Sequence, residues 1–384
     1  MHRTQPLEMR INRRTLRSNK LKLKGFGNWL RASLTGPPPE FGGVPKGFTS
    51  DYAKLNKGQL SGGITCKSQQ LPVPDPNSES IRCGLNQFSH ANWPIFWTHH
   101  RNARLLGKSL VHIDSAGRAC REAMHGPHAW SDPILASRSS PSPKILSGKW
   151  TSLISRWDYG VNYYHWVMDG LTRLCQLECL PSDTGILMHK LAKPFAREAL
   201  AQLGLSERVR YVDEDHLLVE EYYFLSPTAI SGCANPLGLS WLRKRFLNEK
   251  LTEVGTEKLF ITRRAATRTV LDLELVENAF MRAGWTIVDP AKMNWDSQRL
   301  LFSKAAMVAG IHGAGMTNLV WVPAGTPVVE WMPSKFRNAC YEGISILLGN
   351  PHHVMLCPSD NSGNLTIGLK TLDPIFKIFA SIQR

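Results

Sequence analysis

The sequence contains no long hydrophobic run. No stretch of about 20 apolar residues could cross a bilayer, and the charged start is not followed by the apolar segment that a secretory signal requires. Together these absences predict a soluble, cytoplasmic protein that contacts a membrane at most peripherally.

The sequence also lacks the spacing of a metal site. None of its eight cysteines forms a C-x-x-C pair, which zinc sites commonly use. The pairs His99–His100 and His352–His353 have no Cys or carboxylate beside them at ligand spacing. We therefore predict no bound metal and free, buried thiols, the usual state in a reducing cytoplasm.

The composition is that of a globular protein. The chain has 384 residues, of which 42% are hydrophobic and 9% aromatic, and this length exceeds what one core usually supports. The net charge is +15, and residues 1–33 alone hold nine Lys and Arg against one acid. We expect two domains and a strongly basic amino end.

Residues 1–33 mix cations with Ile, Leu, Phe and Trp. This mixture suits an anionic membrane surface, to which each cation contributes about 1 kcal/mol. A solvated basic tail is an equal alternative, and nucleic-acid binding is a third, although no reader motif accompanies the charge. Residues 34–80 are rich in Pro, Gly and Ser, so we predict an irregular extension over 1–80.

Secondary-structure patterns become clear from residue 150 onward. A strand at 150–157 precedes a helix from Asn162 to about Leu180, and further strands and helices follow as far as residue 237. From 256 to 357, strands alternate with helices five times, which predicts a parallel sheet covered on both faces. We predict an α/β protein with an acceptor domain at 81–237 and a nucleotide-binding domain at 238–384, both Rossmann-like and facing a cleft.

The strongest single motif is "AGIHGAGMTN", at residues 309–318. A buried strand ends at Ile311, and the glycines that follow allow a close approach to a ligand. The next helix would offer free N–H groups and a positive dipole end to a phosphate. The alternative interpretation of this motif is a tight turn without a ligand, with His312 as a core residue. The motif is not G-x-G-x-x-G, although Glu330 ends the next strand and could accept hydrogen bonds from ribose.

Three arginines follow another strand of the same half, in "FITRRAATR". Arg263, Arg264 and Arg268 suit bidentate contacts with phosphate because the guanidinium group is planar and always charged. Any one of them alone could belong to a solvated loop. Together with the Gly-rich turn, they predict a site for a nucleoside diphosphate.

Asn162, His165 and Asp169 in "NYYHWVMDG" would share one helix face. Asp169 could orient and charge His165, or could itself take a proton. A satisfied buried network is the alternative for such a stripe. The catalytic interpretation of these three residues is strengthened by the diphosphate site predicted in the other half of the chain.

The three motifs, with "PAGTPVVEW" after the last, resemble glycosyltransferase family 61 over about residues 150–335. This family includes bacterial capsular polysaccharide biosynthesis proteins and plant xylosyl- and arabinosyltransferases. The resemblance implies a GT-B fold, inverting transfer from a nucleotide sugar (usually a UDP-sugar), and no obligatory metal or other cofactor.

The resemblance also implies roles for particular residues. Asp169 and His165 would be catalytic, with Asp169 preferred as the base and His165 positioning the acceptor or the diphosphate, and Asn162 and Tyr164 would bind the acceptor. The donor would contact Arg263, Arg264, Arg268, His312, Gly313, Ala314, Gly315, Thr317, Asn318 and Glu330. One departure is "RTVLDLE", where Asp272 and Leu273 stand in place of the usual Asn and Glu.

We therefore predict an inverting glycosyltransferase, hexosyl or pentosyl, that acts on a glycan or lipid-linked acceptor in surface polysaccharide biosynthesis at the inner face of the membrane. Three alternatives remain open at this point. They are a non-catalytic nucleotide-sugar binder, a dinucleotide-dependent oxidoreductase, and a basic nucleic-acid-binding protein.

Overall fold

The structure is a computed structural model. It describes residues 48–49, 63–64, 95–113, 119–120, 142–154, 160–229, 231–247, 255–264, 269–335, 337–373, 375–376 and 379. The predictions for the basic segment 1–33, for most of the extension 1–80, and for Arg268 lie outside these residues.

The carboxy-terminal half is built on a parallel sheet of five strands. In spatial order they are β11 (Thr286–Val288), β10 (Glu257–Ile261), β12 (Ala305–Ile311), β13 (Val328–Pro333) and β14 (His352–Cys357). All four pairings are parallel, as the alternation of strands and helices predicted. The chain runs outward from the centre in both directions, so the strand order reverses between β10 and β12.

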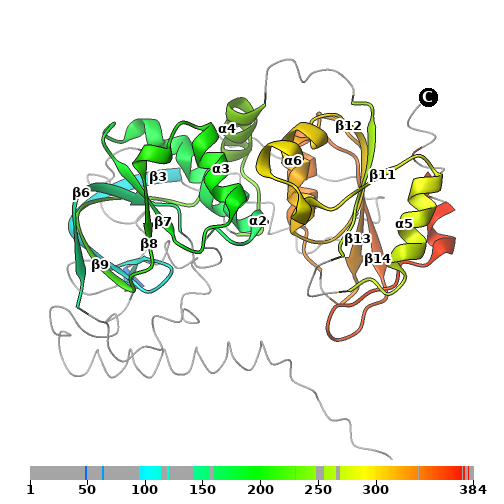
Figure 1. The fold of residues 1–384 in the computed structure, drawn as a ribbon, viewed down its shortest axis with the longest axis horizontal. Helices are drawn as coiled ribbons and strands as arrows, with labels where there is room; N and C mark the ends of the chain where they lie inside the picture. Colours follow the sequence, from blue (N-terminus) through cyan, green and yellow to red (C-terminus); the bar gives the residue numbers. More distant parts are fainter. Residues whose placement is uncertain are drawn as a thin grey trace, which may run out of the picture.

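Helices cover both faces of this sheet, as Figure 1 shows in yellow to red. They are α5 (Leu273–Arg282), α6 (Trp295–Phe302), the 3-10 helix η11 (Ala314–Trp321) and α7 (Cys340–Leu348). In β10, Leu259 and Ile261 enter the core beside α6 and η11, whereas Phe260 enters the core beside α5. The predicted two-sided burial follows from this alternation of side chains along a strand.

The amino-terminal half holds a mixed sheet of nine strands. Its parallel part has the order β9 (His216–Leu225), β6 (Lys144–Ser152), β7 (Gly185–His189) and β8 (Val209–Val212). On the other side of β9 lies β3 (Ile95–Leu106), which is antiparallel to it and leads to β4 (Val111–Ile113). The short strands β1 (Phe48–Thr49), β2 (Gly63–Ile64) and β5 (Ala119–Cys120) complete the sheet.

The sequence patterns did not predict β3, although it is twelve residues long. Its central segment His99–Asn102 is polar and lies at least partly exposed, so the apolar alternation of a half-buried strand is interrupted there. Pairing along β9 supports the strand through this interruption. The amino-terminal half therefore differs from a purely parallel Rossmann-like sheet.

The helix expected from Asn162 to Leu180 is irregular. It consists of an α-helical turn α2 (Tyr163–His165), a π-helical turn η7 (Trp166–Gly170) and a 3-10 helix η8 (Leu171–Cys179). Two side chains of η8 donate hydrogen bonds to backbone carbonyl oxygens of η7. Thr172 Oγ1 donates to Met168 O at 2.7 Å, and Arg173 Nε donates to Asp169 O at 2.8 Å. Such side-chain donors allow a helix to depart from α geometry, and single π turns are frequent at functional sites.

Helices join the two halves. The helix α3 (Pro194–Gln202) packs on α6, and both α2 and α4 (Pro236–Phe246) contact η11. One hydrophobic core continues through these helices from one half to the other. The α/β class with two sheets rich in parallel strands is confirmed, whereas the GT-B arrangement and the domain boundary at 237/238, which falls within α4, stay predictions.

The described helices include none that is long and apolar enough to cross a membrane.

Candidate functional site

The predicted residues lie at the carboxyl ends of strands. In an open α/β sheet, ligands bind outside these ends where the strand order reverses. In the five-stranded sheet the reversal falls between β10 and β12, and Arg263 and His312 directly follow these two strands. In the nine-stranded sheet it falls between β6 and β9, and His165 and Ser231 lie in the segments that follow these strands.

Arg263 lies against the turn after β12. Its Nη1 donates a hydrogen bond to the carbonyl oxygen of His312. A Cβ atom placed on Gly313 would lie 2.8 Å from this nitrogen, which is too close for an ordinary contact. The absence of a side chain at Gly313 therefore makes room for the guanidinium group, and the structure brings Arg263 together with the turn as predicted.

Arg264 points elsewhere. Its guanidinium group forms a two-pronged ion pair with Glu277 of α5, and Thr262 donates to the same buried carboxylate. Its charge is matched by Glu277 rather than directed to the Gly-rich turn, and its place in the donor site stays a prediction. Only alternate residues at a strand end can face the same side.

The turn itself consists of Gly313, Ala314 and Gly315. Gly315 fits closely, since a Cβ atom there would lie 3.0 Å from Ile261 and 3.2 Å from Pro290. The helix that follows is a 3-10 helix rather than the α-helix that the sequence suggested.

Thr317 and Asn318 are fully buried. Asn318 Nδ2 donates to Gln298 Oε1 at 2.8 Å and to Gly315 O at 3.1 Å, and Asn318 Oδ1 accepts a hydrogen bond from the Tyr163 hydroxyl at 2.9 Å. These contacts assign Asn318 to the support of the turn and to the junction of the two halves. The predicted direct contact of this side chain with the donor stays a prediction.

Glu330 has no exposed surface. Its two oxygens accept hydrogen bonds from His312 Nδ1 at 2.5 Å and from His352 Nε2 at 3.0 Å. Burial alone raises the pKa of a carboxyl, but the two histidines outweigh it and lower the pKa of Glu330 to about 2. Both oxygens of Glu330 already accept from histidines, and the expected contact with ribose stays a prediction.

Asn162 caps the amino end of α2. Its Oδ1 accepts from the backbone N–H groups of Tyr164 at 3.0 Å and His165 at 3.3 Å. This N-cap explains why the helix begins here. Its predicted contact with the acceptor is not needed to account for the residue.

His165, Asp169 and Ser231 form the second polar group. Asp169 Oδ2 lies 2.7 Å from His165 Nδ1 and accepts a hydrogen bond from Ser231 Oγ at 2.6 Å. Ser231 also lies 3.2 Å from the same nitrogen of His165. Asp169 is only 2% exposed, whereas the His165 side chain is 24% exposed. His165 is therefore the member that can meet a substrate, and Asp169 orients it.

Ser231 was not identified as a site residue from the sequence motifs. It comes from the segment after β9, 62 residues beyond Asp169. The one available signal was its place after the carboxyl end of a strand in the same sheet.

Two tyrosines connect the polar groups of the two halves. The ring of Tyr164 lies 5.4 Å from that of His165 and 5.7 Å from that of Tyr341. The ring of Tyr341 in turn lies 5.1 Å from that of His312. Burial raises the pKa of both hydroxyls well above the ordinary value, so both are neutral donors. The two strand-end groups therefore border one continuous region.

Two buried cysteines flank this region. Burial and the charge of Asp169 raise the pKa of Cys233 to about 11, and burial raises that of Cys340 well above its ordinary value. Both are protonated at neutral pH, which argues against either as a nucleophile.

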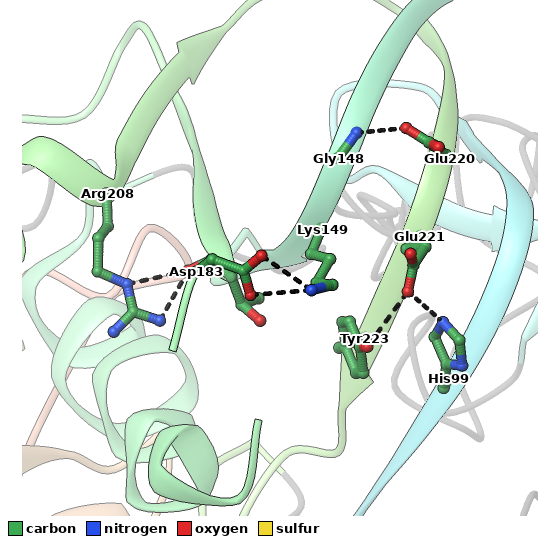
Figure 2. Close-up of polar contacts among 9 residues, drawn as sticks. His99, Gly148, Lys149, Asp183, Arg208, Glu220, Glu221 and Tyr223 are labelled. Carbon is green, nitrogen blue, oxygen red and sulfur yellow. Dashed lines mark hydrogen bonds and ion pairs between the residues drawn. The ribbon is translucent and has the colours of Figure 1, made fainter. Parts of the chain in front are cut away.

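Another polar cluster lies on the nine-stranded sheet, across β3, β9 and β6 (Figure 2). His99 Nε2 lies 3.1 Å from Glu221, to which Tyr223 also donates, and Lys149 pairs with Asp183 at 2.8 Å. The carboxylate beside His99 comes from a neighbouring strand, so spacing along the chain could not reveal it. These polar groups satisfy one another and have the character of sheet-surface contacts.

Within the described ranges, no group of three or more His, Cys, Asp or Glu side chains is arranged to hold a metal ion.

Fold and site together define a two-sheet α/β protein with polar groups at the reversal points of both sheets. Residues 163–329 match the family model described as Glycosyltransferase 61. This matched segment begins with α2 and ends within β13, and the match confirms the resemblance found in the motifs. The family match implies glycosyltransferase activity, with a donor and an acceptor as substrates. No curated protein matches the sequence.

Proposed function

We propose that the protein is an inverting glycosyltransferase that takes a hexosyl or pentosyl group from a UDP-sugar. The acceptor is a glycan or a lipid-linked glycan of surface polysaccharide biosynthesis. One observation carries the proposal. The ring contacts of Tyr164 and Tyr341 connect a histidine–aspartate pair on one sheet with a turn held by Arg263 on the other.

The proton-transfer part of the reaction falls to His165. Asp169 can only accept hydrogen bonds, so Nδ1 of His165 carries its proton, and Nε2 on the other edge of the ring takes the proton of the acceptor hydroxyl. Ser231 holds Asp169 in place. The geometry thus favours His165 as the base and Asp169 as its orienting partner.

Residues of the carboxy-terminal half stabilise the leaving group. As the acceptor oxygen bonds to the anomeric carbon, the bond from that carbon to the diphosphate breaks and negative charge grows on the nucleoside diphosphate. Arg263 and the backbone N–H groups of the 313–315 turn are preorganised to stabilise this charge without a metal ion. The Tyr164 hydroxyl lies between the two halves, buried and with no hydrogen-bond partner among the described residues, and suits an oxygen of the substrate.

Ligand binding tests the donor site first. Thermal unfolding is measured with UDP, GDP, CMP and NAD, each with and without EDTA. At a hundredfold excess over the dissociation constant, a ligand of the native state adds about 2.7 kcal/mol to its stability. We expect UDP to raise the melting temperature in the presence of EDTA. A shift with NAD alone would favour an oxidoreductase instead.

Substitutions then test the catalytic pair. We expect His165→Gln and Asp169→Asn to lower kcat for UDP release in the presence of acceptor by about 10²–10⁴-fold, the range that general base catalysis supplies. UDP affinity should stay within a factor of three. Asp183→Asn, in the exposed Lys149 pair, is the matched control and should keep full activity. Full activity of both test variants would exclude this pair as the base.

A further inference from the structure

Tyr164 has a buried hydroxyl group without a partner. The residue is 6% exposed, and its oxygen is closed off from solvent and has no hydrogen-bond partner among the described residues. Leaving a buried hydroxyl unbonded costs free energy, so few proteins do it. The adjacent Tyr163 shows the ordinary case, since its hydroxyl donates to Asn318 and accepts from Trp321. The unbonded hydroxyl of Tyr164 therefore calls for a ligand.

This hydroxyl is neutral and able to donate. Burial is the main cause that raises its pKa, and the neighbours that raise it further are Cys340, Asp169, Tyr341 and Cys233. A neutral phenol donates one hydrogen bond and can also accept. A sugar hydroxyl has the same two capacities, so the two groups are matched.

Tyr164 lies between the proposed base and the proposed diphosphate site. Its ring is 5.4 Å from that of His165 and 5.7 Å from that of Tyr341, which lies 5.1 Å from the ring of His312 at the Gly-rich turn. In an inverting reaction the attacking oxygen and the leaving group lie on opposite faces of the sugar. The sugar ring must then occupy the space between the base and the diphosphate, where Tyr164 lies.

We propose that Tyr164 is a specificity-determining residue of the donor site, and that its hydroxyl donates a hydrogen bond to a hydroxyl oxygen of the transferred sugar. This inference rests on the proposed function. Because the Tyr164 oxygen is closed off from solvent, the sugar must separate the side chains that cover it as it binds. The family resemblance assigned Tyr164 to the acceptor instead, and the two assignments predict different effects of a substitution.

Removing this hydroxyl should not destabilise the protein. Tyr164→Phe takes away no hydrogen bond among the described residues, so we expect its urea midpoint to equal or exceed that of the wild type. Tyr163→Phe is the matched variant at the adjacent position and should lower the midpoint, because Asn318 loses a donor. An equal loss in both variants would show that the Tyr164 hydroxyl has a partner inside the protein and would overturn the proposal.

Calorimetry on the wild type and Tyr164→Phe tests the sugar contact. UDP-glucose and UDP-xylose serve as hexosyl and pentosyl probes, and the one that the wild type binds more tightly is compared with UDP. We expect Tyr164→Phe to bind this UDP-sugar about tenfold more weakly, as the loss of one hydrogen bond predicts, and to bind UDP within twofold of the wild type.

The opposite results are equally distinct. Equal affinity of the two proteins for the UDP-sugar would overturn the proposal, and so would a loss confined to the KM of the acceptor. Failure of the wild type to bind UDP would instead show that the proposed function itself is wrong.

Analogues of the UDP-sugar that each lack one hydroxyl group identify the hydroxyl that Tyr164 contacts. For the wild type, removal of that hydroxyl should weaken binding about tenfold. Tyr164→Phe should bind the same analogue and the parent UDP-sugar equally, because the contact is already lost. Equal losses in the two proteins for every analogue would overturn the proposal.

Discussion

At the scale of single residues, the site depends on pairs rather than on isolated side chains. Asp169 is nearly fully buried and owes its role to His165 and Ser231, and Glu330 owes its charge to two histidines. His165 and Asp169 could be chosen from the sequence because they stand four apart on a helix. Ser231 and His352 could not, since their partners are 62 and 22 residues away.

The buried charge of Glu330 gives a prediction for stability and pH. The pKa of this carboxyl is about 2 in the folded protein, against an ordinary value of 4.5. The unfolded chain therefore binds the proton more readily, so the contribution of Glu330 to the free energy of unfolding is complete above about pH 5 and is lost as the pH falls toward 2.

Urea unfolding of the wild type and Glu330→Gln checks this sign. We expect the wild type to be the more stable protein at pH 7, and its advantage to shrink steadily between pH 5 and pH 3.5. An advantage that stays constant or grows on acidification would contradict the assignment.

At the scale of elements, the turn after β12 shows how a motif becomes a site. The sequence located the glycines, and the structure explains Gly313 by the guanidinium group that lies against it. The sequence also predicted that α/β alternation would bring Arg263 to the same edge. It could not predict that Arg264 would turn to Glu277, because that choice depends on how α5 packs.

Gly313→Ala tests this contact. The backbone of Gly313 is extended, so alanine causes no backbone strain at this position. The new Cβ atom must nevertheless displace the Arg263 guanidinium group. We expect UDP affinity to fall about tenfold, the equivalent of roughly 1.4 kcal/mol, which is typical of a charged hydrogen bond.

A double-mutant cycle with Arg263→Ala shows the cause. The glycine substitution should have little further effect once the guanidinium group is gone, and additive losses would refute displacement. Gly310→Ala serves as a contrast. Its Cβ would lie 2.9 Å from Ile261 Cβ, so it should lower stability.

At the scale of the whole molecule, the two halves share a core. The Tyr163 hydroxyl donates to Asn318 across the junction at 2.9 Å and accepts from Trp321 Nε1 at 3.3 Å. Trp295 of α6 donates to Gln202 of α3 at 2.9 Å. These contacts predict that both sheets unfold in one cooperative step.

Tyr163→Phe tests the junction. It leaves the buried oxygen of Asn318 without this donor, so we expect a loss of about 1–3 kcal/mol in the free energy of unfolding. Denaturant curves followed by tryptophan fluorescence and by circular dichroism should still coincide. Two separated transitions in the wild type would show that the halves are independent.

The sequence by itself determined the α/β class, the alternation of strands and helices from 256 to 357 and the family resemblance, because these depend on periodicity and on short motifs. The long strand β3 and the irregular helix after Asn162 escaped it, since pairing with β9 and side-chain donors to carbonyls override local pattern. Only the tertiary structure decided which polar residues meet. It joined Asp169 to His165 and Ser231, and Glu330 to His312 and His352, because a buried charge needs hydrogen-bond partners, wherever in the chain those partners lie.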